Sequence, residues 1–224
     1  LQNLNVLFAI DRAGLVGEDG PTHAGSFDIS FLRCIPNLII MTPSNENETY
    51  KLLSAGYNYN GPAAVRYPRG KGIGMPIDKN LQPLEIGKGI VRQKGSTIAI
   101  LAFGSMVKPS LEAAEKLDAT LVDMRFVKPL DEELISELTV THQLIVTVEE
   151  NTIIGGAGSA VNEYLAKTNI SMPTLNLGLP DKFLEHGKAS EMLDQINLNC
   201  EGITQAIRKK QNGCRLQHKS AEKS

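Results

Sequence analysis

The sequence predicts an α/β protein built from two doubly wound, mostly parallel sheets that follow one another along the chain. Three observations support this fold class. Short apolar runs alternate with segments of helical periodicity through most of the 224 residues. Glycine and proline interrupt the alternation between residues 70 and 89, which is typical of a linker between domains. An apolar fraction of 42% is sufficient for a buried core.

The first unit contains a strand–helix–strand sequence. Its apolar runs of the buried-strand type are residues 6–10, 38–41 and 63–67. After the second run, Ser44 is expected to cap a helix on which Tyr50, Leu53 and Tyr57 share one face. This order of elements predicts parallel strands joined by a crossover helix.

The second unit repeats the alternation more clearly. Strands are predicted at residues 97–103, 119–124, 143–148 and 172–177. Helices are predicted at residues 109–117, 131–138, 156–166, 189–196 and 202–209. The expected domain limits are a first domain over 1–75, a linker over 76–88, a second domain over 89–210, and a basic, solvated and mobile tail over 211–224.

Composition and charge exclude several classes of protein. A net charge of −2 gives no reason to expect nucleic-acid binding. The longest apolar runs are too short to span a membrane. Cys34, Cys200 and Cys214 are too scattered for a disulfide framework or a CxxC metal site, which favours a reducing compartment. The sequence has no initiator Met and runs at once into an apolar strand, so we expect it to start within a domain.

The glycine-rich segment 11–25 is the first candidate site. It follows the first predicted strand, at the edge where open α/β sheets place their ligands. It carries a fixed cation (Arg12), a carboxylate (Asp19) and an imidazole (His23). Arginine suits phosphate or carboxylate ligands, and histidine transfers protons near neutral pH. The alternative is an ordinary surface loop with solvated side chains.

The second candidate site contains Arg66 and Arg69, at the end of the third predicted strand. Arg12 and Arg69 are expected at the same edge of the sheet, where two guanidinium groups suit a phosphate monoester. Strand alternation sends Arg66 and Arg69 to opposite sides, so only one of them is expected to face this site. Ion pairing with neighbouring acids is the alternative for both.

The third candidate is the turn at residues 149–160, which partly matches a dinucleotide-binding motif. Gly156 and Gly158 fit the pattern, but Val161 stands where the third glycine belongs. Glu149 and Glu150 would repel a pyrophosphate, so close packing of the helix start is the favoured interpretation. The isolated histidines elsewhere offer no metal-ligand set, with solvated positions expected for His142 and His218 and a position near a cleft possible for His186.

Five segments together resemble the 1-deoxy-D-xylulose-5-phosphate synthase family of transketolase-like thiamine-diphosphate enzymes. They are residues 11–25 (DRAGLVGEDGPTHAG), 32–36 (LRCIP), 64–70 (AVRYPRG), 122–131 (VDMRFVKPLD) and 148–151 (VEEN). The resemblance extends from about residue 4 to residue 210, with matching order and spacing. Residues 1–75 then resemble the latter part of the pyrimidine-binding domain, and residues 89–210 resemble the carboxy-terminal domain of the family.

The resemblance implies a reaction and roles for individual residues. Family members decarboxylate pyruvate and join the two-carbon remnant to glyceraldehyde 3-phosphate, in a step that feeds isoprenoid, thiamine and pyridoxal synthesis. Arg12 and Arg69 match residues that bind the acceptor phosphate. Asp19 and His23 match polar residues at the mouth of the active site, with His23 as the residue implied to assist proton transfer. Glu18 departs from the small residue that many relatives have.

Parts of the family pattern are absent from this sequence. No Gly-Asp-Gly segment with a downstream Asn is present, so the ligands of thiamine diphosphate and Mg²⁺ are expected outside this chain. The same holds for the catalytic glutamate, so we expect no cofactor-binding or metal-binding residue here and no synthase activity from this chain alone. By resemblance, the whole enzyme is a homodimer in a bacterial cytoplasm or a plastid.

Alternatives of other classes stay open at this point. The chain could be part of a transketolase or the β subunit of a 2-oxoacid dehydrogenase. It could also be a non-catalytic dimerisation module, or a nucleotide-binding module that uses Gly155–Gly158.

Overall fold

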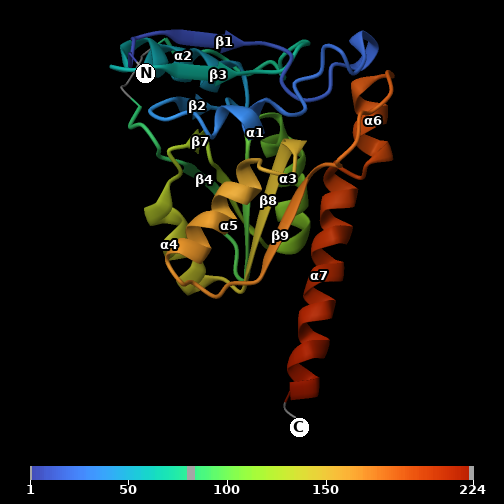
Figure 1. Cartoon of the computed structure of the whole chain (residues 1–224). Helices are drawn as coiled ribbons and strands as arrows, with labels where there is room; N and C mark the ends of the chain where they lie inside the picture. Colours follow the sequence, from blue (N-terminus) through green and yellow to red (C-terminus); the bar gives the residue numbers. More distant parts are fainter. Residues whose placement is uncertain (1, 80–83, 222–224) are drawn as a thin grey trace.

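The structure is a computed structural model that describes residues 2–79 and 84–221, with side chains described as far as residue 213. It contains two sheets and confirms the α/β fold class (Figure 1). Residues 80–83 of the predicted linker and 222–224 of the predicted tail lie outside the described residues.

The first sheet has the strand order β1-β3-β2-β7. Its strands are β1 (Leu7–Ile10), β3 (Ala63–Arg66), β2 (Ile39–Met41) and β7 (Phe126–Lys128). β1, β3 and β2 are parallel, and α2 (Glu46–Asn58) connects β2 to β3, so the predicted strand–helix–strand unit is confirmed. β7 pairs antiparallel with β2, although it comes from the segment predicted in the second domain.

Two details of α2 differ from the prediction. Asn45, not Ser44, is the N-cap: its side chain accepts a hydrogen bond from the backbone N–H of Glu48 at 3.0 Å. The buried face consists of Glu48, Leu52 and Gly56, whereas Tyr57 is 82% exposed. The helical period was predicted correctly. The buried face was not, because a search for apolar residues does not find a face made of a glutamate, a leucine and a glycine.

The second sheet has the strand order β4-β6-β5-β8-β9. Its strands are β4 (Ile90–Gln93), β6 (Thr120–Asp123), β5 (Ile98–Ala102), β8 (Leu144–Thr152) and β9 (Thr174–Leu179). All neighbours are parallel except β4 and β6. β4 was not predicted, because its short sequence IVRQ has no strong alternation.

Helices cover both faces of the second sheet, as the doubly wound prediction requires. α3 (Val107–Leu117) and α7 (Cys200–Ala221) pack on one face, and α4 (Glu132–Thr141) and α5 (Ala157–Lys167) pack on the other. The alternation of β5 explains this arrangement, since Ile98, Ile100 and Ala102 join one apolar cluster while Ala99 and Leu101 join the other. The short helices are α1 (Asp28–Leu32), α6 (Ala189–Gln195), η1 (Gly17–Asp19) and η2 (Gly104–Met106).

Two segments continue beyond their predicted ends. β8 extends through residues 149–152, where a turn was expected. α7 continues to Ala221 and projects away from the body of the molecule (Figure 1), so residues 211–221 of the predicted solvated and mobile tail are helical. The carboxyl end of β8 points toward α1 and the first sheet (Figure 1), where the backbone N–H of Thr152 donates to the carbonyl of Ser26 at 2.7 Å.

The two sheets share one apolar cluster. Ile29, Leu38 and Ile40 from the first unit lie in the same cluster as Leu101 and Met124 from the second. β7 and this shared core join the segments that the sequence predicts as separate domains. The limits 1–75, 76–88, 89–210 and 211–224 stay predictions.

Candidate functional site

The loop that follows β1 is closed at its neck by backbone hydrogen bonds. The N–H of Gly25 donates to the carbonyl of Arg12 at 2.9 Å, and the N–H of Ala13 donates to the carbonyl of Tyr67 at 3.0 Å. The second bond places the loop beside the end of β3. Arg12 and Arg69 therefore meet at the carboxyl edge of one sheet, where parallel strands commonly place ligands.

Asp19 lies between the two arginines. Its Oδ2 accepts a hydrogen bond from Nε of Arg12 at 3.4 Å and forms an ion pair with Nη1 of Arg69. The Arg69 guanidinium, followed by that of Arg12, holds the pKa of Asp19 below its ordinary value. Because both arginines reach the same carboxylate oxygen, an anion at that position would be within reach of both guanidinium groups.

The backbone at Arg12 has an unusual conformation. Its φ of 59° lies in the left-handed region, which few residues other than glycine adopt. Such conformations persist where the surroundings hold them, and they concentrate at functional sites. The two hydrogen bonds at the neck of the loop supply that restraint. The Arg12 guanidinium forms ion pairs with two carboxylates, Asp11 at 2.8 Å from Nη1 and Asp19 at 3.4 Å from Nε.

His23 lies apart from this cluster. Its side chain is exposed, and its Nδ1 is 3.0 Å from the hydroxyl of Thr22. Within the described part of the chain, no direct bond links His23 to Arg12, Asp19 or Arg69. The structure therefore brings three of the four predicted site residues together and leaves His23 at the rim of the same loop.

Arg66 is buried on the other side of β3, as strand alternation predicts. It is 4% exposed, and its Nε donates to Oδ1 of Asp28 at 2.6 Å. Its Nη2 donates to the carbonyls of Gly25 at 2.7 Å and Glu150 at 2.8 Å. Arg66 thus ties the loop to the end of β8 and is not available to a ligand.

Glu150 of β8 fixes the position of the loop after β1 through a hydrogen bond, a role that the sequence did not reveal. Its Oε1 accepts from the N–H of Leu15 at 2.8 Å, and its Oε2 accepts from the hydroxyl of Ser105 at 2.5 Å. Burial raises the pKa of this carboxyl group. At Gly14, where φ is 72°, any side chain would overlap the Glu150 carboxyl group. The second sheet therefore positions the loop of the first.

Glu149 occupies the start of α5, where a dinucleotide phosphate would have to bind. Its carboxylate accepts from the N–H groups of Ala157 at 2.7 Å and Gly158 at 2.8 Å. A side chain at Gly158 would collide with Thr147 and Asn176. The glycines of this turn thus serve close packing, the interpretation that the sequence favoured over nucleotide binding.

The other histidines differ from expectation in one case. His142 is half-buried, and its Nε2 is 2.7 Å from the hydroxyl of Thr120, so it is not a solvated side chain. Its position before a strand was visible in the sequence, but its partner on a neighbouring strand was not. His186 is exposed beside Gly20 of the loop. The side chain of His218 lies outside the described part of the structure.

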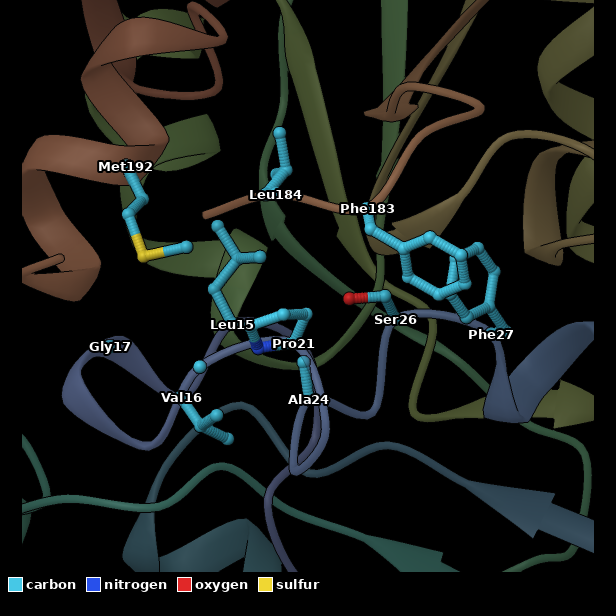
Figure 2. Close-up of a pocket in the computed structure, with 11 residues that line it drawn as sticks. Leu15, Val16, Gly17, Pro21, Ala24, Ser26, Phe27, Phe183, Leu184 and Met192 are labelled. Carbon is cyan, nitrogen blue, oxygen red and sulfur yellow. The ribbon is translucent and has the colours of Figure 1, made fainter. Parts of the chain in front are cut away.

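The loop also packs against the segment before α6. Figure 2 shows Leu15 and Pro21 of the loop facing Leu184 and Met192 across a cavity of about 10 Å³. Phe27 and Phe183 meet edge to face, with ring centroids 5.5 Å apart. This space admits one water molecule at most, so it is a packing contact and not a ligand site.

No membrane-spanning or metal-binding feature occurs within residues 2–79 and 84–221. No helix in this part is both long and apolar enough to cross a bilayer. No group of three or more His, Cys, Asp and Glu side chains is arranged to hold a metal ion there.

Comparisons with known proteins match nearly the whole chain. The family model of the transketolase C-terminal domain matches residues 87–203, and that of the transketolase pyrimidine binding domain matches residues 1–73. The chain is 61% identical over 210 residues to the 1-deoxy-D-xylulose-5-phosphate synthase of Pseudomonas fluorescens, which covers 94% of this chain and 33% of that protein. Identity to the synthase of Pseudomonas aeruginosa is also 61%, over 94% of this chain and 34% of that protein.

A solved structure described as a split gene transketolase, inactive beta4 tetramer, has the same fold. Its TM-score is 0.81 at 30% identity, and the match covers 93% of this chain and 67% of that chain. This chain spans about a third of the length of the curated relatives it matches.

Proposed function

Since this chain belongs to the transketolase C-terminal domain family, we propose that it forms part of a thiamine-diphosphate-dependent 1-deoxy-D-xylulose-5-phosphate synthase. The observation that carries the proposal is 61% identity to such synthases over 94% of the chain. The whole enzyme would condense pyruvate with glyceraldehyde 3-phosphate and release CO₂. The bacterial origin of these relatives favours a bacterial cytoplasm over a plastid as the compartment.

We assign the acceptor phosphate to the Arg12–Asp19–Arg69 cluster. Two guanidinium groups bind a phosphate dianion more strongly than one, and their convergence on a single oxygen of Asp19 supports this role. Asp19 keeps the two arginines oriented before the ligand arrives. His23, at the exposed rim of the same loop, is the residue proposed to transfer a proton to or from the substrate.

Among the side chains that the structure describes, none are grouped in a way that would hold Mg²⁺. The amide groups at the start of α5 are already bonded to Glu149. We therefore propose that the main ligands of thiamine diphosphate and Mg²⁺ lie in a part of the enzyme outside this sequence.

The solved relative supports inactivity of this chain by itself. That protein, which aligns with 93% of this chain, is described as inactive and as a β4 tetramer. It favours a second candidate function, an assembly module that self-associates as a homodimer or larger oligomer. Incubation of the purified chain with pyruvate, glyceraldehyde 3-phosphate, thiamine diphosphate and Mg²⁺ should release no CO₂; sustained turnover would refute this proposal.

Calorimetric titration with glyceraldehyde 3-phosphate tests the phosphate site. The chain should bind this ligand saturably, and an Arg12→Ala, Arg69→Ala double variant should lose at least tenfold in affinity. Arg208→Ala, which removes an exposed arginine on α7, is the matched control and should bind as the unchanged protein does. Equal affinity in the double variant would contradict the assignment, and no binding with a stable oligomer would favour the assembly module.

A further inference from the structure

A second cavity lies beside the candidate site, between the two sheets. Its volume is about 480 Å³, far larger than the packing contact in Figure 2. It is lined by the start of α2, residues 67–73 after β3, the start of α3, Glu150 of β8, and α6 with the turn that follows it. A cavity of this size is within the range that accommodates a small organic ligand.

The acidic side chains that line the cavity are already bonded within the protein. Glu46 accepts from the N–H of Gly74 at 2.6 Å, and Glu150 is held by Leu15 and Ser105. Asp194 accepts from the side-chain amide of Asn199 at 2.6 Å. Their negative charge is therefore partly compensated before any ligand arrives.

The lysines on the cavity wall are not compensated in this way. Lys71 and Lys108 both line the cavity, and neither forms an ion pair with any residue in the described part of the chain. Lys108 lies in the first turn of α3, whose N-cap position has no side-chain cap. An ammonium group in the first turn of a helix, with a second ammonium group on the wall of the same cavity, favours an anion.

The rest of the wall is largely apolar. Tyr67, Ile73 and Leu193 line it with half-buried or exposed side chains, whereas Met106 and Leu198 are each only 2% exposed. A fully hydrated ion would leave this surface unused, whereas a ligand with an apolar body would cover it.

We propose that this cavity binds a small organic phosphate, with its phosphate at Lys71 and Lys108 and its apolar body on Tyr67, Ile73 and Leu193. The cavity adjoins the acceptor-phosphate cluster without coinciding with it, because Arg69 lines the cavity but Arg12, Asp19 and His23 do not. It shares Arg69 and Glu150 with the site, so a bound ligand would alter the position of the residues that hold the loop.

Calorimetric titration with 1-naphthyl phosphate tests the proposal on the full 224-residue chain. We expect one saturable site, with inorganic phosphate and 1-naphthol each binding at least tenfold more weakly. A Lys71→Ala, Lys108→Ala double variant should lose at least tenfold in affinity. The control Lys209→Ala, an exposed lysine on α7, should leave affinity within twofold, and circular dichroism should show that all variants are folded.

Two further measurements separate this cavity from the acceptor site. Arg12→Ala should leave the affinity for 1-naphthyl phosphate within twofold, and saturating glyceraldehyde 3-phosphate should not displace the probe. Loss of binding in Arg12→Ala with full binding in the lysine variant would overturn the proposal. Absence of saturable binding to the folded chain, or equal binding of inorganic phosphate, would overturn it as well.

Discussion

At the scale of single residues, Arg66 and Arg69 lie only three positions apart, yet Arg66 is a buried structural residue and Arg69 is an exposed residue of the candidate site. Arg66 is the last residue of β3, and Arg69 lies three residues beyond the end of that strand. Arg66 is 4% exposed and has a salt bridge and two backbone carbonyls as partners. The side chain of Arg69 is 51% exposed and points to the Asp19 cluster. Because β3 ends at Arg66, the turn after the strand sets the direction of Arg69, and the neighbouring elements decide which of the two side chains is buried.

This difference predicts unequal effects on stability. Arg66→Ala leaves Asp28 buried without its cation and should cost about 3–5 kcal/mol. Arg69→Ala removes an exposed ion pair and should change the free energy of unfolding by no more than about 1 kcal/mol. Urea denaturation followed by circular dichroism measures both values. Similar midpoints for the two variants would contradict a structural role for Arg66.

At the scale of elements, the end of β8 has a larger role than its sequence suggests. Residues 149–151 look like a polar turn, yet they lie inside a strand and are buried. Glu149 caps α5, Glu150 holds the loop after β1, and the side-chain Oδ1 of Asn151 accepts from the N–H of Ile29 at 3.2 Å. Buried polar groups of this kind are stable only when they have partners, which here come from three different elements.

The cap formed by Glu149 predicts a pH dependence of stability. Burial raises the pKa of Glu149 from its ordinary 4.5 to about 7. Between these values the folded chain binds more protons than the unfolded chain, so this group lowers stability as pH rises from about 4.5 to 7. This shift in the pKa of Glu149 lowers the free energy of unfolding by about 3 kcal/mol at most over that pH range.

Glu149→Gln removes this titration and tests the sign. The variant should be less stable at each pH, because an amide has one acceptor oxygen for two N–H donors. Its urea midpoint should nevertheless decline less between pH 5 and pH 7 than that of the unchanged protein. A parallel decline in both proteins would show that Glu149 does not titrate in this range.

At the scale of the whole molecule, buried charges join the two sheets in addition to the shared core. Glu48 of α2 accepts from Nε of Arg125 at 2.7 Å and from its Nη2 at 2.9 Å. Nη2 of Arg92 bridges Glu48 at 3.0 Å and Asp123 at 2.8 Å. These residues lie in or beside α2, β4 and β6, so the network crosses from one predicted domain to the other.

We therefore predict that both sheets unfold in one cooperative transition. Hydrogen exchange measured by mass spectrometry at increasing urea concentrations should give the same midpoint for peptides from β2 and from β8. As a control, the exposed end of α7 should exchange at lower urea. Two well-separated midpoints for β2 and β8 would show that the sheets are independent, as the sequence alone suggests.

The sequence by itself determined the fold class, most strands and helices, and the family resemblance. Period-2 and period-3.6 patterns are local properties, and so are the motif segments, including those that carry Arg12, Asp19, His23 and Arg69. The meeting of Arg12 and Arg69 at one sheet edge followed from the parallel topology and needed no contact information. Identity of 61% to the Pseudomonas fluorescens synthase confirms the resemblance.

Only the tertiary structure decided where charged residues are buried and which elements hold the loop. Glu48, Glu149 and Glu150 look like surface residues in sequence, because nothing local shows the distant N–H groups and guanidinium groups that compensate them. β7 joins the first sheet across a long stretch of intervening chain, and the 480 Å³ cavity is bounded by five separate segments. Such features depend on long-range pairing, and a local pattern of residues carries no information about which distant segment will complete it.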